Sequence, residues 1–139
     1  MRSFVAMGVS IVKLEIERIH HVSLAVRDLQ RARAFYTGML GLQEIDRPAF
    51  DTNGIWYRVG ELQLHLTHSP QAETLRCGDP LGTDGHFAVW VKSYRDAVQW
   101  LTDRGISYTA QPQSVAGFAQ IWLLDPDHNI IELDAPHGS

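Results

Sequence analysis

Three histidines and one glutamate stand at intervals that suit a metal centre. His21 and His65 are separated by 44 positions, and His86 and Glu132 by 46. His86 also follows His21 by 65 positions, so each half of the chain offers one pair of ligand side chains. Three imidazoles and one carboxylate can hold a divalent transition metal and still leave positions open for water or substrate. The residue types therefore point to a catalytic metal site rather than a closed structural one.

The first histidine of each pair lies in a segment that reads as a strand followed by a helix. Residues 14–26 alternate apolar with other side chains, which predicts an extended segment with His21 on the face opposite to the apolar positions. Asp28 then caps an amphipathic helix that closes at a glycine. The same order returns with an alternating strand headed by His86 and a capping-box pattern at 93–96 before a second helix.

Three further strands are expected after each helix, at 42–45, 55–59 and 62–67 and again at 106–110, 118–124 and 129–133. Both halves thus read β-α-β-β-β, which indicates an internal duplication. We predict one α+β domain over 1–139, an open, cupped, barrel-like sheet around a metal site. Its parts are a first module at 14–70, a linker at 71–83, a second module at 84–134, and tails at 1–13 and 135–139.

The amino-acid composition limits the kinds of molecule that this protein is expected to bind. The 139 residues are 45% hydrophobic with a formal net charge of −4, and their Lys and Arg residues are scattered, which argues against nucleic acid. The single cysteine, Cys77, cannot form an internal disulfide, and this usage favours a cytoplasmic setting. The apolar run in 1–12 is too short to span a bilayer, so no membrane partner is expected. We expect a small-molecule substrate and a second copy of the chain.

The other histidines and the tryptophans fit simpler roles. His20 has the opposite strand parity from the neighbouring ligand candidate and reads as structural or edge-exposed. His68 and His128 lie in or beside turns. There they are either exposed to solvent or in contact with a metal-ligating side chain without binding the metal themselves. Three tryptophans read as core or interface aromatics: Trp56, Trp100 and Trp122. Trp90, on the face of His86, is a candidate wall of a substrate cavity.

Several of these segments resemble the vicinal oxygen chelate superfamily, also called the glyoxalase, bleomycin resistance and dioxygenase superfamily. The resemblance extends from about residue 16 to residue 134. It is carried by HVSLAVRDL at 21–29, AFY and LGL at 34–36 and 40–42, GHFAV at 85–89, and LDPDHNIIEL at 124–133. The fold that it implies, a pair of β-α-β-β-β modules in an open barrel around a metal, agrees with the order of elements above.

The resemblance also implies a ligand set. His21, His86 and Glu132 fall on the usual ligand triad, and His65 falls where glyoxalase I-like enzymes place a glutamate. The implied cofactor is a divalent metal ion, Fe, Mn, Zn, Ni or Co, which oxygens of the substrate chelate. Glu132 is then a ligand, the catalytic base, or both by turns.

The resemblance favours a metal-dependent enzyme of the glyoxalase/dioxygenase type with isomerase or lyase chemistry on a small molecule. The enzymatic alternatives are an extradiol-type dioxygenase and a fosfomycin-resistance-like thiol transferase, because both use a His, His, Glu triad. The alternative of another class is a non-catalytic protein that binds a small molecule such as an antibiotic. Related small members pair their modules between chains, which implies a homodimer.

Overall fold

The computed structural model describes residues 12–71 and 85–139. None of the helices in this described part is long and apolar enough to cross a membrane. The second helical segment, η1, continues α1 directly as wider, π-helical turns. The elements are β1 (His21–Val26), α1 (Leu29–Arg33), η1 (Ala34–Met39), β2 (Gln43–Ile45), β3 (Gly54–Val59), β4 (Leu62–His68), β5 (His86–Trp90), α2 (Tyr94–Asp103), β6 (Tyr108–Gln111), β7 (Ala119–Leu124) and β8 (Ile130–Ala135).

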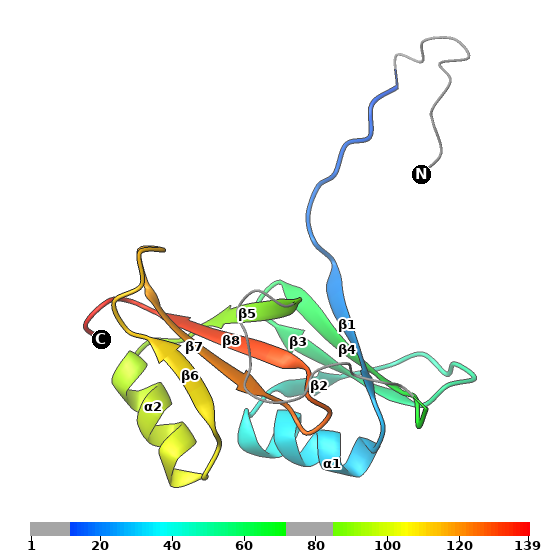
Figure 1. The fold of residues 1–139 in the computed structure, drawn as a ribbon. Coiled ribbons are helices and arrows are strands. Elements are labelled where there is room, and N and C mark those ends of the chain that lie inside the picture. The colour runs from blue at the N-terminus through cyan, green and yellow to red at the C-terminus, as the bar shows by residue number, and fades with distance from the viewer. Residues whose placement is uncertain (1–11, 72–84) are drawn as a thin grey trace.

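The strands form two four-stranded sheets of identical topology. Their strand orders are β1-β4-β3-β2 and β5-β8-β7-β6. In each sheet the first and last strands of the module are parallel neighbours, and the other pairs are antiparallel. The predicted α+β class and the two β-α-β-β-β modules are confirmed, and the sheets are curved without closing into a barrel (Figure 1). The predicted linker, 71–83, lies outside the described residues except for residue 71.

Local signals in the sequence account for both helices. Asp28 and Ser93 each accept a hydrogen bond from the backbone N–H three residues later, which satisfies a donor that the first helical turn leaves unpaired. The glycines that end the two helical segments, Gly41 and Gly105, have φ angles of 70° and 64°, a region that disfavours larger side chains. Both helices lie on the same side of the two sheets (Figure 1).

A single apolar core fills the space between the sheets and the helices. It takes one face of each sheet, so the residues that contribute to the core alternate along the strands with residues of the outward face. Strand β1 follows the predicted parity, with Val22, Leu24 and Val26 on the core side. The buried members of the core are Val26, Ala32, Phe35, Tyr36, Ile55, Tyr57, Leu64, Leu66, Leu101, Ile121, Leu123, Ile131 and Leu133.

Polar contacts join the first module to the turn between β7 and β8. The Tyr36 hydroxyl donates a 2.6 Å hydrogen bond to the buried Asp125 carboxylate. The Asp127 carboxylate accepts from the backbone N–H of Arg27 and from the guanidinium of Arg31, each at 3.1 Å. The helix of one module is thereby tied to the last turn of the other, which fixes the relative position of the two sheets.

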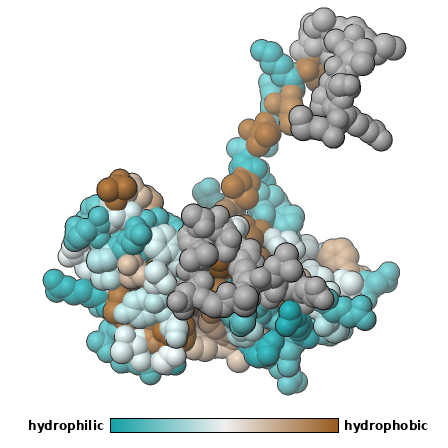
Figure 2. Space-filling view, viewed as in Figure 1, coloured by the Kyte–Doolittle hydropathy of each residue, from teal (hydrophilic) through white to brown (hydrophobic). Residues whose placement is uncertain are grey.

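The segment 12–20, called the arm below, leaves the folded body on the side away from the helices (Figure 1). The sequence predicts an extended segment from residue 14, but strand pairing begins only at His21, because β4 starts at Leu62 and offers no backbone farther along. Leu14 and Ile16 on the arm are 88% and 81% exposed. Figure 2 shows hydrophobic residues along the arm, which stands clear of the body.

Candidate functional site

The outward face of the first sheet carries two of the predicted ligands. His21 on β1 and His65 on β4 stack their rings at 4.2 Å between centroids with 18° between planes. The other face of His65 lies against Trp56 of β3, its partner across the strand pair, at 3.9 Å and 3°. His65 is therefore buried although it points away from the core, with 7% of its surface exposed. We call His21 and His65 the first ligand pair.

Hydrogen bonds hold the first ligand pair in orientation. Nε2 of His65 lies 2.8 Å from Oε1 of Gln63. An amide oxygen only accepts, so the proton is on Nε2 and Nδ1 of His65 keeps its lone pair. The Nδ1 atoms of His20 and His21 lie 2.9 Å apart. His20, which strand parity places outside the site, thus touches its first member.

The protonation of His65 favours metal binding. Burial lowers the pKa of this imidazole below its ordinary value, and the charges of His21, His20 and Arg47 lower it further. A neutral imidazole has a free lone pair, whereas an imidazolium has none. Near neutral pH His65 therefore offers an unprotonated nitrogen to a cation.

The second sheet repeats the arrangement with the other two predicted ligands. Nε2 of His86 on β5 lies 3.2 Å from Oε1 of Glu132 on β8. Glu132 is 5% exposed, and Trp122 faces it across the β7–β8 pair as Trp56 faces His65 in the first sheet. We call His86 and Glu132 the second ligand pair. Each sheet thus presents one ligand pair with a tryptophan opposite its last member.

A second carboxyl group lies beside Glu132. The pKa of Asp134 is raised to about 7, first by burial and then by the hydrogen bond and negative charge of Glu132, while the charge of His86 acts in the opposite direction. Oδ1 of Asp134 is buried and lacks a hydrogen-bond partner within the described structure. Sequence reasoning missed both Asp134 and Gln63. The signal was available, because each stands two positions from a ligand candidate on the same strand and therefore on the same face.

The two ligand pairs are not gathered into one cluster within the chain. Among residues 12–71 and 85–139, no group of three or more His, Cys, Asp or Glu side chains is placed to hold a metal ion. Each pair lies on the face of its sheet opposite to the shared core. The structure brings His21 to His65 and His86 to Glu132, and a four-residue centre stays a prediction that needs both pairs at one point.

The remaining histidines have other partners. Nε2 of His68 lies 3.1 Å from the backbone oxygen of Arg27, and Nε2 of His137 lies 3.0 Å from that of Ser114. His128 occupies the turn after β7 with a φ of 65°. These three side chains thus lie at the end of β4 and in loops, and the backbone oxygens that His68 and His137 contact belong to neither ligand pair.

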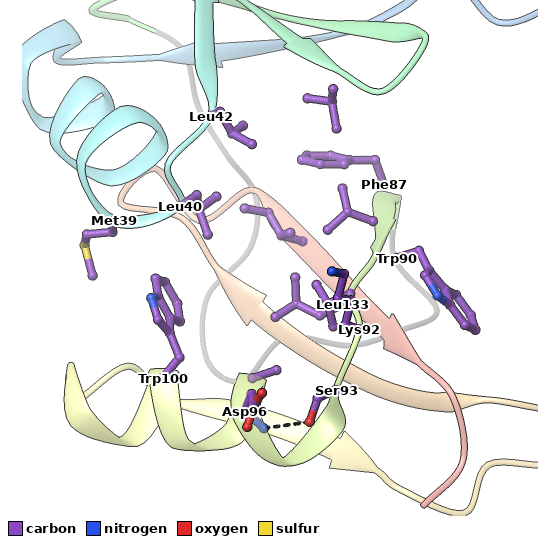
Figure 3. Close-up of a pocket in the computed structure, with 15 residues that line it drawn as sticks. Met39, Leu40, Leu42, Phe87, Trp90, Lys92, Ser93, Asp96, Trp100 and Leu133 are labelled. Atoms are coloured by element: carbon purple, nitrogen blue, oxygen red, sulfur yellow. Dashed lines mark hydrogen bonds between the residues drawn. The ribbon is translucent and has the colours of Figure 1, made fainter. Parts of the chain in front are cut away.

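A separate cavity of about 450 Å³ opens between the modules on their core-facing side (Figure 3). Its wall is almost entirely apolar, with Lys92, Ser93 and Asp96 at its edge. Trp90 borders this cavity and meets Phe118 edge to face at 5.8 Å between ring centroids. The core-side residues Phe87 and Leu133 line it, whereas the ligand pairs point to the opposite faces of their strands.

Comparisons with known proteins agree with this architecture. Residues 18–133 match the model of the Glyoxalase/Bleomycin resistance protein/Dioxygenase superfamily, and the chain belongs to that superfamily. It is 30% identical over 125 residues to a lactoylglutathione lyase of Salmonella typhimurium, covering 84% of this chain and 90% of the relative. Relatives of this chain are therefore named as enzymes.

Solved structures share the fold. A glyoxalase family protein from Bacillus anthracis superposes with a TM-score of 0.72 at 23% identity, covering 90% of this chain and 99% of the other. A fosfomycin resistance protein, FosX, from Listeria monocytogenes, solved with Mn(II) and a dihydroxypropylphosphonic acid, superposes with a TM-score of 0.68 at 18% identity. That match covers 88% of this chain and 94% of FosX.

Proposed function

We propose that this protein is a metal-dependent enzyme that binds a small molecule through neighbouring oxygens and performs isomerase or lyase chemistry on it. The observation that carries the proposal is the matched placement of the two ligand pairs, one on each sheet, with a buried carboxylate in the second. Membership of the superfamily and the similarity to a lactoylglutathione lyase support the same class of reaction. The single cysteine favours a cytoplasmic setting for it.

The donor atoms fit a divalent transition metal. Three imidazoles and one carboxylate suit Fe, Mn, Zn, Ni or Co, and they do not suit the all-oxygen shells that Mg and Ca prefer. His65 has a lowered pKa, and Gln63 directs its proton away from Nδ1. The lowered pKa and the position of the proton on Nε2 both leave Nδ1 of His65 available to bind a cation.

Each residue of the two pairs has a defined task in the proposed reaction. When bound, the metal ion polarises an oxygen of the substrate and so acidifies the neighbouring C–H bond. Glu132 takes the proton from that carbon and returns it to the adjacent one, because it is the one carboxylate among the four predicted ligands. His21, His65 and His86 orient the substrate. Trp56 stacks on His65, and Trp122 is the cross-strand neighbour of Glu132, so each would shield the last member of its pair from water.

In this proposal a homodimer supplies the geometry that residues 12–71 and 85–139 of one chain do not provide. The two ligand pairs lie on outward faces of different sheets, so the first pair of one copy can meet the second pair of another. A two-fold axis would generate two such centres in the same dimer. The proposed enzyme is therefore a homodimer whose metal sites are shared between protomers.

A second candidate function is non-catalytic binding of a small apolar molecule. The apolar cavity of about 450 Å³ favours it, because this volume falls in the usual range for ligand sites of about 300–1,000 Å³. Such a protein needs no metal. Metal content therefore separates the two functions.

The test is metal analysis of full-length protein that is stripped with a chelator and then reloaded with each candidate ion. We expect about one tightly bound ion per chain, the stoichiometry of shared sites in a dimer. Glu132→Gln and His86→Ala should each weaken binding at least about 100-fold, since a lost ligand costs no less than a lost ligand-orienting group. His68→Ala is the control and should keep the ion. Occupancy well below one ion per chain with every metal would exclude the enzyme and leave the binding protein.

A further inference from the structure

Aromatic rings continue the first ligand pair across the outward face of its sheet. The row runs from His21 through His65 and Trp56 to Phe50, which lies in the loop 46–53 between β2 and β3. The Trp56 and Phe50 centroids lie 5.9 Å apart with 45° between the ring planes. The row begins on the predicted metal ligand His21 and ends on the exposed ring of Phe50, with two rings between them.

Phe50 is exposed, yet contacts hold it in place. It is 53% exposed, and the guanidinium of Arg47 lies over its ring at 4.9 Å from the centroid. The same guanidinium donates to the backbone oxygen of Thr52 at 2.9 Å and to the hydroxyl of Thr52 at 3.3 Å. A loop that serves only as a connection has no need of an aromatic ring held open to water.

Gly54 allows this loop to lie close to the sheet. A Cβ atom there would lie 2.2 Å from the backbone oxygen of Leu66 and 2.9 Å from Nε of Arg47, so a side chain cannot be added without displacing backbone. The close approach places Arg47, and through it Phe50, beside the strand that carries Trp56. The position of the exposed ring therefore follows from the backbone.

We propose that Phe50 and Trp56 form the subsite for an aryl group of the substrate, whose neighbouring oxygens chelate the metal. This rests on the proposed function and narrows it to aryl-substituted substrates. Trp56 is in van der Waals contact with His65, so a substituent that leaves the metal-bound oxygens toward β3 meets Trp56 and then Phe50. Inclined and offset rings are the arrangement in which aromatic groups attract each other.

Two arginines, Arg47 and Arg58, lie beside the row. The guanidinium of Arg47 is engaged by Thr52 and by the Phe50 ring. The residues that flank Trp56 along the face are Arg58 on the same strand, Gln63 and Thr67 of β4, and Ile45 of β2; Arg58 is the charged one among them. The subsite thus offers ring faces to an aryl group, and the charges of the residues beside it are positive.

The experiment compares two hydroxamates that share one chelating group. Benzohydroxamate carries an aryl ring and acetohydroxamate a methyl group, and both bind metals through two neighbouring oxygens. Their Kd values are measured by calorimetry on metal-loaded, full-length protein. We expect benzohydroxamate to bind about tenfold more tightly or better, because its ring is buried against apolar surface. Phe50→Ala should bring the ratio close to one with the acetohydroxamate Kd unchanged.

Two further variants serve as controls for the ratio of the two Kd values. Phe50→Tyr keeps the ring and should keep the ratio, and Val115→Ala, at a fully exposed apolar side chain on another loop, should do the same. An unchanged ratio in Phe50→Ala would overturn the aryl subsite, and so would a loss of dimers in that variant, because Phe50 would then be a contact between copies. If neither hydroxamate binds to metal-supplied wild-type protein, the proposed function fails and the subsite with it.

Discussion

Tyr36 and Asp125 form a buried hydrogen bond of 2.6 Å between modules whose contacting residues stand 89 positions apart. Asp125 also accepts from the backbone N–H groups of Asp127 and Asn129, both at 2.8 Å. The bond therefore connects the first helix to a turn that is itself organised around the same carboxylate. Because each sheet carries one ligand pair, this hydrogen bond between the modules helps to determine the orientation of the two ligand pairs relative to each other.

Removing the Tyr36 hydroxyl should destabilise the whole fold. Tyr36→Phe deletes a donor to a buried carboxylate, and a hydrogen bond to a charged group is worth about 1.5–3 kcal/mol. The free energy of unfolding, from urea titration, should fall by that amount. Tyr57→Phe is the matched control, since its hydroxyl pairs with the hydroxyl of Thr37 at 2.8 Å and should cost about 0.5–1.5 kcal/mol. Equal losses in the two variants would contradict the special role of the Asp125 bond.

The Asp125 carboxyl should make stability depend on pH with a definite sign. Burial raises its pKa above the ordinary value, and hydrogen bonds from Tyr36 and Asn129 offset part of the rise. The folded state then holds a proton that the unfolded state has already released, starting at the unfolded pKa of about 3.9. The contribution of Asp125 is most favourable below that pH, falls as pH rises to the folded pKa, and is constant above it.

This dependence is measured by comparing wild type with Asp125→Asn, which cannot titrate. The difference between their unfolding free energies should decline with rising pH across the window and level off above it. A carbon-13 NMR titration gives the pKa of Asp125 directly, and Tyr36→Phe should raise it further by removing a hydrogen bond that lowers it. A difference that grows with pH would show that the hydrogen bonds outweigh burial.

Much of the fold follows from local patterns, while the relation between the modules does not. The caps at Asp28 and Ser93 and the parity of β1 are confirmed, because each depends on neighbours a few residues away. The repeat likewise predicted two modules of one topology. The side on which the sheets join depends on the Tyr36 hydroxyl and the Asp125 turn, and no periodicity in the sequence records that contact.

The candidate site, too, can be predicted from the sequence only in part. Strand parity predicts that the members of each ligand pair share the outward face of their sheet, since alternation decides which face a side chain takes. In the structure the two members of each pair lie side by side. Parity gives no information about distance between sheets, so the sequence left open whether the four residues meet within one chain. The contact between His20 and His21 was missed because His20 is the last residue of the arm, just before β1, where the pleat of the strand does not constrain the side chain.

Mixing two inactive variants should restore metal sites if these are shared between protomers. His21→Ala damages the first ligand pair and Glu132→Gln the second. In a mixed dimer one centre receives both defects and the other receives none. Random exchange of equal amounts gives half mixed dimers, so about a quarter of all sites should bind metal normally.

The readout is tightly bound metal after denaturation and joint refolding of the two variants, with each variant refolded alone as the control. Recovery to about a quarter of the wild-type metal content supports sites built from two chains. If the mixture binds no more metal than the variants do separately, each site belongs to one chain.

The arm should contribute to the contact between copies. Leu14 and Ile16 are more than four-fifths exposed and share one face of an extended segment, whereas Glu15 and Glu17 take the other. Burial of such a side chain is worth about 1.5–3 kcal/mol, and a monomer gains nothing from holding two of them in water. Leu14→Asp with Ile16→Asp should therefore raise the dimer dissociation constant by at least about tenfold for each side chain that the partner covers.

Analytical ultracentrifugation measures this constant, and Glu15→Gln with Glu17→Gln is the matched control on the opposite face of the arm. The control should leave the dimer unchanged, because its side chains point away from the apolar face. The arm continues directly from β1, and His20 at its end touches His21, so a displaced arm should also loosen the first ligand pair. Metal affinity and dimerisation should thus weaken together in the Asp variant, and an intact dimer in that variant would exclude the arm from the interface.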